Sequence, residues 1–408
     1  MKRSAMAIVA ASALVLVGCS ANTSAGSSEP AKQGDPIVIG ASIPMSGALA
    51  GFGPLIQDGY EDAVKQVNDA GGILIDGELH QVKLVVQDGK SDSTASGDNA
   101  RSLILDEGAI ALLGSVSPPN TVPVSNVADV ERIPMITGLT PVRAWLAGNT
   151  DGWKYAWDVF FTEDQMTQTQ FTTSDLTETN KKVALFTDSG QDGIVMGQLW
   201  EANAPKLGYE VVTHAEFPVG TTEYTSFIND AKAAGAEIVI TQMNPPDAFA
   251  LWKQMKALAF VPKLAYCEKC GATSAWQKAL GPVAEGTLST NYWDASEHTD
   301  NADAQRLIKE FGDTIGENGD MSALVAAQSV AKVLLDAIAT AGSTDPDAIN
   351  EAIGKTDADY AWGHIKFNDQ HYSTIEAFHG QWQGDKMVPV DPKFADHGTL
   401  AVPVQGLQ

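Results

Sequence analysis

Short runs of apolar, mostly β-branched residues alternate with amphipathic stretches from Ile37 onward. The run 37–40 predicts a buried strand, and the apolar positions in 55–70 recur at the spacing of a helix that Gly71 and Gly72 end. Further strands are expected at 82–86, 110–113 and 133–136, and further helices at 95–105 and 122–130.

A second series of the same kind begins with a strand at 183–186. Its expected helices are 195–207, 225–234 and 248–258, and its expected strands are 209–212 and 237–240. Two successive β-α-β-α series predict an α/β chain of two doubly wound lobes, each built on a parallel sheet covered by helices. Because ligands of such sheets bind beyond the carboxyl ends of the strands, we expect one binding cleft between the lobes.

The first 36 residues follow a different pattern. Two basic residues precede an apolar run over 5–17, which is the layout of a secretory signal peptide at 1–18 and is too short for a permanent membrane span. Leu16-Val17-Gly18-Cys19 resembles the bacterial lipobox, which implies cleavage before Cys19 and acylation of that cysteine. The alternative is an ordinary secretion signal with a chance cysteine. Residues 19–36, rich in Ser, Ala, Gly and Pro, are then expected to form a lipidated flexible tether.

Charge and length narrow the choice of partners and architecture. Cleavage would leave 390 residues with 24 basic and 51 acidic side chains, a net charge of −27. Such a surface repels nucleic acid and anionic lipid headgroups, so we exclude both as partners and expect contact with the bilayer through the lipid on Cys19. The length exceeds what one core usually supports, which again favours two lobes. We find no second apolar run of membrane-spanning length in the sequence.

Cys267 and Cys270 form a C-x-x-C pair. In an exported protein this spacing favours a disulfide, with free thiols as the second interpretation. A zinc site would need two further ligands, and a redox couple would open a helix of a thioredoxin-like unit. We therefore expect no metal. The three histidines His364, His371 and His379 lie among strand-like residues, where surface positions are the simpler explanation.

No motif supplies catalytic machinery. Gly51-Phe52-Gly53 lacks the third glycine of a dinucleotide-binding loop, and the sequence contains neither a G-x-x-x-x-G-K-[ST] phosphate loop nor a G-x-S-x-G nucleophile motif. We expect neither enzymatic activity nor a cofactor.

Several segments resemble one family, the bilobal substrate-binding lipoproteins of ABC importers for branched-chain amino acids (leucine, isoleucine and valine). Residues 37–47 resemble its first strand and Ser-Gly loop, and 60–72 resemble its first helix with the double glycine. The segments 110–114, 133–137, 183–193 and 363–367 match in kind and order.

The resemblance implies a type I periplasmic-binding-protein-like fold, with two lobes joined by a three-strand hinge near Asp158, Asn291 and Tyr360. The N-lobe would comprise 37–158 plus 292–360, and the C-lobe 159–291 plus 361–400, with 401–408 as a tail. The implied function is that of an extracytoplasmic, membrane-anchored receptor, expected to be a monomer, that delivers a small organic ligand to an importer permease. A ligand sensor for a membrane signalling protein is the alternative. An exported hydrolase that uses Asp188, Asp192 and Glu268 is a third possibility from another class.

The resemblance also implies which residues contact the ligand. Ser117 and Thr140 match positions that hold a carboxylate, and Glu268 matches the acid that pairs with an ammonium. Pro118 replaces a serine and Asp192 a tyrosine, so an α-amino acid would lose an N–H donor and meet an extra acid. We expect an amino acid, amide, amine or aromatic compound, with leucine, isoleucine and valine binding weakly. The expected ligand contacts are Ser46, Phe52, Ser117, Asn120, Leu139, Thr140, Asp192, Asn244, Glu268 and Trp293.

Overall fold

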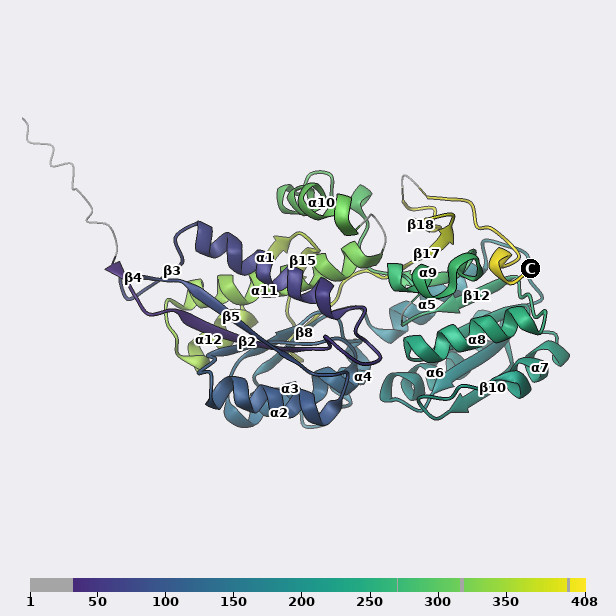
Figure 1. Cartoon of the computed structure of the whole chain (residues 1–408), viewed down its shortest axis with the longest axis horizontal. Coiled ribbons are helices and arrows are strands. Elements are labelled where there is room, and N and C mark those ends of the chain that lie inside the picture. The colour runs from purple at the N-terminus through teal and green to yellow at the C-terminus, as the bar shows by residue number, and fades with distance from the viewer. Residues whose placement is uncertain (1–31, 270, 316–318, 395–396) are drawn as a thin grey trace, which may run out of the picture.

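The computed structural model describes residues 32–408 except 270, 316–318 and 395–396. These residues form two lobes that lie side by side along the long axis of the molecule (Figure 1). The predicted signal peptide, Cys19 and the tether up to residue 31 lie outside the described residues, and so does Cys270. The lipid anchor and the Cys267–Cys270 disulfide therefore stay predictions.

The N-lobe is built on a six-stranded parallel sheet in the order β16-β8-β7-β6-β2-β5. Its strands are β2 (Ile37–Ile43), β5 (Val82–Asp88), β6 (Ala111–Leu113), β7 (Met135–Thr137), β8 (Ala156–Val159) and β16 (Tyr372–Ser373). Its helices are α1 (Gly53–Asp69), α2 (Ser93–Leu105), α3 (Pro118–Glu131), α4 (Val142–Leu146), α10 (Ala302–Ile315), α11 (Gly319–Ala341) and α12 (Pro346–Gly354). Figure 1 shows α1 and α11 on one face of the sheet and α2 and α3 on the other, so both faces are covered.

Two small sheets complete the N-lobe. One contains β1 (Lys32–Gln33), β3 (Ile73–Ile75) and β4 (Glu78–His80), and the other is the hairpin of β14 (Asp357–Tyr360) and β15 (Gly363–Lys366). A short 3₁₀-helix, η3 (Ala295–His298), precedes α10.

The C-lobe is built on a seven-stranded sheet in the order β10-β9-β11-β12-β13-β17-β18, in which the first five strands are parallel to one another, β17 is antiparallel to β13, and β18 is antiparallel to β17. Its strands are β9 (Lys182–Asp188), β10 (Glu210–Phe217), β11 (Ile238–Gln242), β12 (Leu264–Cys267), β13 (Leu288–Asn291), β17 (Phe378–Gln383) and β18 (Lys386–Pro389). Its helices are α5 (Glu163–Ser174), α6 (Gln191–Asn203), α7 (Thr225–Ala233), α8 (Pro245–Ala257) and α9 (Ser274–Leu280), with 3₁₀-helices η1 (Pro205–Leu207), η2 (Gly281–Ala284) and η4 (Gln405–Leu407).

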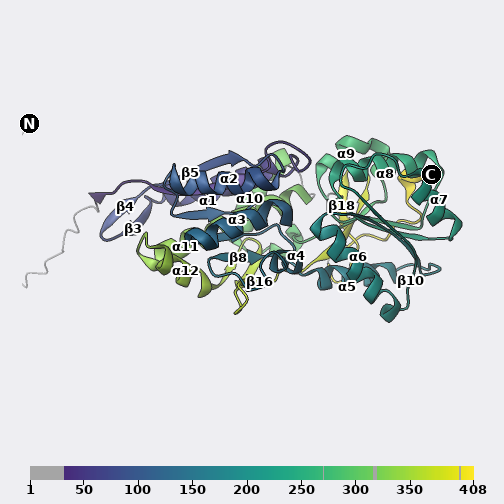
Figure 2. The same ribbon diagram turned by 90° about the horizontal axis from the view of Figure 1, so that it is seen from below.

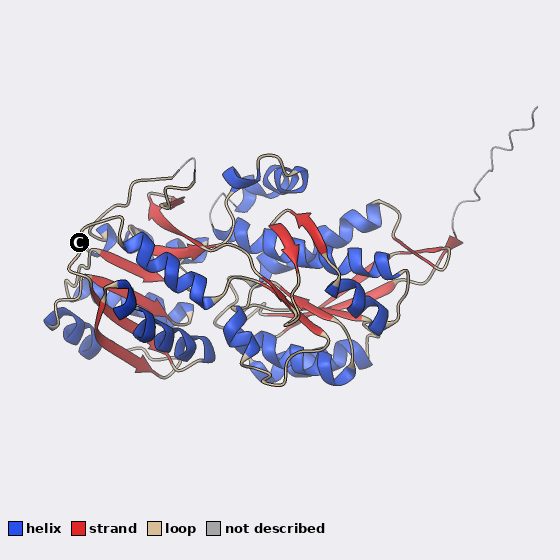
Figure 3. Cartoon of the chain, turned by 180° about the vertical axis from the view of Figure 1, so that it is seen from behind, coloured by secondary structure: helices blue, strands red, loops and turns tan. Residues whose placement is uncertain are grey.

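Figure 3 shows the sheets of both lobes flanked by helices. This arrangement follows from the sequence pattern, because strands such as β11, buried at every position, need apolar partners on both faces. The predicted fold class of two doubly wound α/β lobes is confirmed.

Within the described residues the chain passes between the lobes three times. It leaves the N-lobe sheet after β8, returns after β13, and crosses again between β16 and β17. The predicted third crossing near Tyr360 is wrong, because Tyr372 and Ser373 of β16 still pair with β8 of the N-lobe. Residues 361–373 therefore belong to the N-lobe, and the hairpin of β14 and β15 precedes the crossing.

Helix α11 corrects a second expectation. By length and composition alone it is apolar enough to cross a membrane, contrary to the expectation that no second run of that length exists. In the structure 89% of its most apolar 18-residue stretch is buried, and the helix packs along α1 in the N-lobe. Its apolar character is thus explained by burial within the protein.

The last residues are part of the C-lobe. Val404 and Leu407 are buried, and the backbone N–H of Val404 donates to the carbonyl of Pro262 at 3.2 Å. The segment 401–408, expected as a tail, is therefore packed against the lobe, while β1 lies at the opposite end of the molecule (Figure 2).

Candidate functional site

A cavity with about 490 Å³ of space not occupied by atoms, part of it open to solvent, lies between the lobes. It is lined by residues from both lobes and from the first two crossings, mostly at or just beyond the carboxyl ends of strands. The lining residues are Phe52, Val116, Ser117, Leu139, Pro141, Phe160, Phe161, Met166, Asp192, Gln242, Glu268, Lys269, Thr290 and Tyr292. This is the position that the two parallel sheets predict for a ligand.

One side of the cavity is apolar. Phe52, Val116, Leu139 and Pro141 come from N-lobe loops. The two crossings add an aromatic cluster, in which the ring of Phe160 lies 4.1 Å from that of Phe161 and 4.9 Å from that of Tyr292, measured between centroids. Such a surface suits an apolar or aromatic ligand body.

The other side carries the charged groups, all from the C-lobe. Lys269 Nζ lies 2.9 Å from Asp192 Oδ2, and the two side chains are only 9% and 3% exposed. Gln242 Nε2 donates to the same oxygen at 3.1 Å. Burial by itself would raise the pKa of Asp192, but the charge of Lys269 and these hydrogen bonds outweigh it, so the pKa lies below its ordinary value. Asp192 is therefore a charged partner of Lys269.

The start of α6 holds Asp192 in place. A Cβ atom on Gly193 would lie 2.1 Å from the carbonyl oxygen of Asp188, so only glycine lets the helix start this close to β9. Asp188 accepts hydrogen bonds from the backbone N–H groups of Gly190 and Asn244, both at 2.9 Å. The strand end, the helix start and the neighbouring loop are thus tied together beneath the ion pair.

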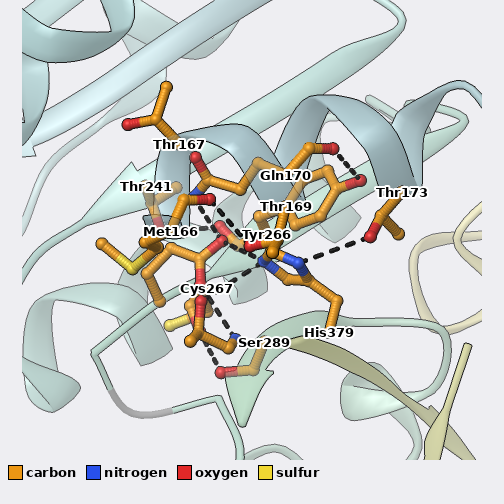
Figure 4. Close-up of polar contacts among 12 residues, drawn as sticks. Met166, Thr167, Thr169, Gln170, Thr173, Thr241, Tyr266, Cys267, Ser289 and His379 are labelled. Atoms are coloured by element: carbon orange, nitrogen blue, oxygen red, sulfur yellow. Dashed lines mark hydrogen bonds and ion pairs between the residues drawn. The ribbon is translucent and has the colours of Figure 1, made fainter. Parts of the chain in front are cut away.

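Glu268 lines the cavity but is bonded on all sides by the protein. Oε1 accepts from Gln170 Nε2 at 2.5 Å and lies 3.1 Å from His379 Nε2, and Oε2 accepts from the backbone N–H of Thr290 at 2.9 Å and from its hydroxyl. Figure 4 shows Gln170 from α5 and His379 from β17 converging at this point. Burial would raise the pKa of Glu268, but the charge of His379 and these bonds lower it overall.

This network disfavours the predicted pairing of Glu268 with a ligand ammonium. Its side chain is fully buried, and four contacts already occupy its lone-pair directions. The resemblance predicts Glu268 as a ligand contact, and the structure places it in the cavity lining. The sequence could not show that Gln170 and His379, distant in the chain, surround its carboxylate. The hydrolase interpretation is disfavoured for a similar reason, since Asp188, Asp192 and Glu268 are each held by protein donors.

The N-lobe loop before α3 offers few donors to an anion. Pro118 and Pro119 have no N–H, and the N–H groups of Asn120 and Thr121 both donate to the carbonyl of Ser117 at 3.1 Å. Ser117 occupies the N-cap position with a φ of 69°, unusual for a residue other than glycine, and its hydroxyl makes no capping bond. The helix start that would hold a carboxylate is therefore largely blocked.

Five of the predicted contacts line the cavity: Phe52, Ser117, Leu139, Asp192 and Glu268. The other five do not, because each side chain or backbone bonds elsewhere. Asn120 Nδ2 donates to the Val116 carbonyl, and Thr140 Oγ1 donates to Thr121 Oγ1 at 2.8 Å in the N-lobe interior. Asn244 occupies the N-cap position of α8 without a side-chain capping bond, and its backbone N–H donates to Asp188 Oδ2 at 2.9 Å. Ser46 bonds Asp88 at an exposed position, and Trp293 donates to the Ala361 carbonyl and stacks on His298.

Sequence reasoning missed most of the remaining lining. Lys269 was visible beside Glu268, but its pairing with Asp192 joins segments far apart in the chain. Phe160 and Phe161 follow β8 directly, where an aromatic pair at a lobe crossing looks like ordinary core. Gln242, Thr290 and Met166 have no distinguishing sequence signal.

The lobes also contact each other beside the cavity, around α4. The Glu163 carboxylate of α5 accepts the backbone N–H groups of Arg143 and Ala144 at 2.7 and 2.8 Å, and Gln191 Nε2 of α6 donates to the Ala144 carbonyl at 2.8 Å. Burial raises the pKa of Glu163 to about 7, although these N–H donors oppose the rise. The carboxyl of Asp158, buried nearby in β8, has a pKa well above its ordinary value because of its burial and the charge of Glu163. Among the described residues, no three metal-ligating side chains come together.

A two-lobed α/β chain with a cavity between its lobes has the architecture of a solute-binding protein. The family model of periplasmic binding proteins matches residues 36–383, so the chain belongs to that family. The resemblance noted from the sequence is thereby confirmed at the level of the family.

Individual relatives agree with this assignment. The chain is 28% identical over 316 residues to a Leu/Ile/Val-binding protein homologue of Brucella melitensis, covering 76% of this chain and 81% of the relative. A leucine-binding protein from Thermotoga maritima superposes with a TM-score of 0.76 at 21% identity, covering 86% of this chain and 97% of the other. A solute-binding protein from Rhodopseudomonas palustris in complex with benzoate superposes with a TM-score of 0.74 at 19% identity, covering 90% of this chain and 97% of the other. At these identities the structures show a shared fold. Proteins of this family bind small molecules outside the cytoplasm and work with ABC-transporter permeases.

Proposed function

We propose that this protein is a lipid-anchored extracytoplasmic receptor that closes its lobes around a small organic molecule and delivers it to an ABC importer. The observation that carries the proposal is the cavity, to which both lobes and two crossings contribute and which pairs an apolar wall with a buried ion pair. Hinged closure of two lobes is a standard way to enclose and release a ligand. The relatives named for solute binding support the same role.

Anchoring through Cys19 rests on the lipobox in the sequence. The described chain starts at β1, at the end of the N-lobe remote from the C-lobe (Figure 1). A tether at that end would leave the cleft and the C-lobe free to meet a permease. Cys19→Ala is expected to abolish membrane retention while the soluble lobes fold normally, and fractionation of cells measures this. Retention of the mutant in the membrane fraction with its signal cleaved would contradict the anchor.

A thermal-shift screen tests the receptor role directly. A ligand that binds only the native state stabilises it by RT ln(1 + [L]/Kd), about 2.7 kcal/mol at a concentration of 100 Kd. The screen should include amino acids, amides, amines and aromatic acids. A stabilising compound should also reduce the radius of gyration in small-angle scattering and be taken up by cells only when this protein is present. Stabilisation without closure or uptake would count against a transport receptor.

The ligand is expected to be small and organic, with leucine, isoleucine and valine binding weakly. Support comes from the two prolines at the start of α3 and from Glu268, whose contacts with the protein leave no clear place for an α-ammonium group. The relatives' names include both leucine and benzoate as ligands, so the family tolerates different head groups. Calorimetry with the three amino acids decides the question. Micromolar affinity for any of them would restore a branched-chain amino-acid receptor.

A further inference from the structure

We propose that the Lys269–Asp192 pair, with Gln242, selects a ligand whose polar end is an uncharged carboxamide. This inference rests on the proposed receptor function and names the class of its ligand. In this proposal Lys269 and Asp192, in place of Glu268, contact the polar end of the ligand.

The first step concerns charge. Lys269 and Asp192 neutralise each other at 2.9 Å, and His379 stands beside Glu268 at 3.1 Å with both side chains fully buried. Each charged group in the lining therefore has an opposite charge or several hydrogen bonds beside it. A carboxylate or an ammonium ligand would bring an additional charge into a site with no matching counter-charge, which is costly in a buried setting. At the start of α3 prolines fill the first two positions, so this loop offers an anion the unpartnered Ser117 hydroxyl in place of a set of backbone N–H donors, and it brings no positive charge.

The second step concerns hydrogen bonds. Asp192 Oδ1 and Gln242 Oε1 are both buried acceptors without a hydrogen-bond partner, and both residues line the cavity. Buried acceptors of this kind call for N–H or O–H donors. Two unpartnered acceptors repel a carboxylate, which has no proton to offer, whereas Lys269 is a donor suited to a carbonyl oxygen.

A primary amide meets all of these conditions. It carries two N–H donors for the two acceptors, one carbonyl oxygen for the Lys269 ammonium, and no net charge. An alcohol has a single donor, and an amine lacks the acceptor. The rest of the ligand then packs against Phe52, Phe160 and Phe161 on the apolar side. The structure thus points to an aromatic or branched aliphatic carboxamide.

Calorimetry with isosteric probes tests this. Benzamide, benzoate and benzylamine share one body, and isovaleramide, isovalerate and isoamylamine share another. At least one amide is expected to bind about tenfold or more tighter than its acid and amine isosteres. Equal or tighter binding of an acid or an amine overturns the inference but leaves the receptor function intact. Failure of both amides to bind at about 1 mM also overturns it. Failure of the whole ligand screen would remove the receptor function itself.

Two variants give a signature that a general structural defect cannot produce. Asp192→Asn leaves Lys269 without its counter-charge, so the ratio of acid to amide affinity should rise about tenfold or more. Lys269→Met leaves Asp192 uncompensated, so the ratio of amine to amide affinity should rise instead. Asp347→Asn makes the same chemical change in the exposed Arg132–Asp347 pair and should leave both ratios unchanged. If one of these two variants fails to fold, the affinity ratio measured for the other still tests the role of the Lys269–Asp192 pair. Shifts in the same direction for both, or no shift, contradict the assignment.

Discussion

The two sides of the cleft have opposite chemistry. The N-lobe loops and the crossings contribute aromatic and aliphatic side chains, whereas the C-lobe contributes Asp192, Gln242, Glu268, Lys269 and Thr290. The polar groups are held by strand ends and helix starts of one lobe, so their geometry does not depend on closure. The apolar side is completed by crossing residues, whose position changes when the lobes move. We infer that the C-lobe recognises the ligand's head, while the rest of the cleft encloses its body.

The largest effect of a substitution on the polar side of the cleft is expected at Glu268. Replacing it with alanine leaves Gln170, His379 and the Thr290 backbone without their acceptor in the C-lobe interior. The free energy of unfolding, measured in urea, should fall by about 3–5 kcal/mol, because several buried donors lose their acceptor at once and each unsatisfied buried group costs about 1–3 kcal/mol.

A matched control exists in the same lobe. Glu201 pairs with His214 at 2.8 Å, but its side chain is 52% exposed. Glu201→Ala should therefore cost less than about 1 kcal/mol. Similar losses for the two variants would show that the Glu268 network adds no more stability than a surface pair.

The apolar side is tested at Phe52, which is 7% exposed and lines the cavity. Phe52→Ala should weaken ligand affinity by about 1.5–3 kcal/mol through lost apolar contact, while the preference among head groups stays the same. Phe227→Ala, at a partly buried position packed against the C-lobe core and outside the cavity lining, serves as the control and should change stability without a matching change in affinity. A change in head-group preference at Phe52 would contradict the division of roles between the two sides.

The contact between the lobes at α4 predicts that the free energy of unfolding depends on pH. Glu163 has a folded pKa of about 7 against an ordinary 4.5. Between these values the folded state holds a proton that the unfolded state has lost, so stability from this group falls as pH rises, by up to about 1.4 kcal/mol per pH unit. Above pH 7 the dependence should flatten.

Glu163→Gln should reduce this slope in urea unfolding measured between pH 5 and pH 8. The slope should not vanish, because burial also raises the pKa of Asp158. An unchanged slope would show that Glu163 does not titrate in this range.

The smallest effect on stability is expected at the exposed ion pair beside Glu163. Arg143 and Asp164 join the lobes at 2.7 Å, but their side chains are 52% and 54% exposed. Asp164→Asn should change stability by less than about 1 kcal/mol, and less at high salt. A larger loss in thermal unfolding would mean that the surface pair, and not the buried Glu163, holds the lobes together.

The sequence predicted the architecture because its signal is local. Buried strands such as β2 and β9 contain short apolar runs, and the helices between them show a regular apolar spacing. The third crossing was misplaced for the same reason. The hairpin of β14 and β15 has the strand pattern expected of a crossing, while β16, which belongs to the N-lobe, has only two residues.

The site was only partly predictable, because its chemistry depends on pairing across the fold. Asp192 was singled out as an extra acid, but its charge is neutralised by Lys269 from the end of another strand. A residue that matches a family position can thus be predicted to lie near the cavity. The match does not show which of its hydrogen bonds remain available to a ligand.

The crossings also contain an optical reporter. All nine tryptophans are buried, and seven of them lie within the lobes, whose interiors keep their packing when lobes move as rigid bodies. The other two lie beside the crossings: Trp293 comes just after the second crossing, and Trp362, in the N-lobe turn between β14 and β15, packs against Phe160 and Tyr292 of the first two crossings. Trp362 Nε1 donates to the Tyr292 carbonyl at 2.9 Å, and Trp293 donates to the Ala361 carbonyl at 3.0 Å, so each indole links one segment near a crossing to another. Any ligand-induced change in intrinsic emission should therefore originate at these two indoles, which makes the unlabelled protein its own fluorescent sensor of lobe motion.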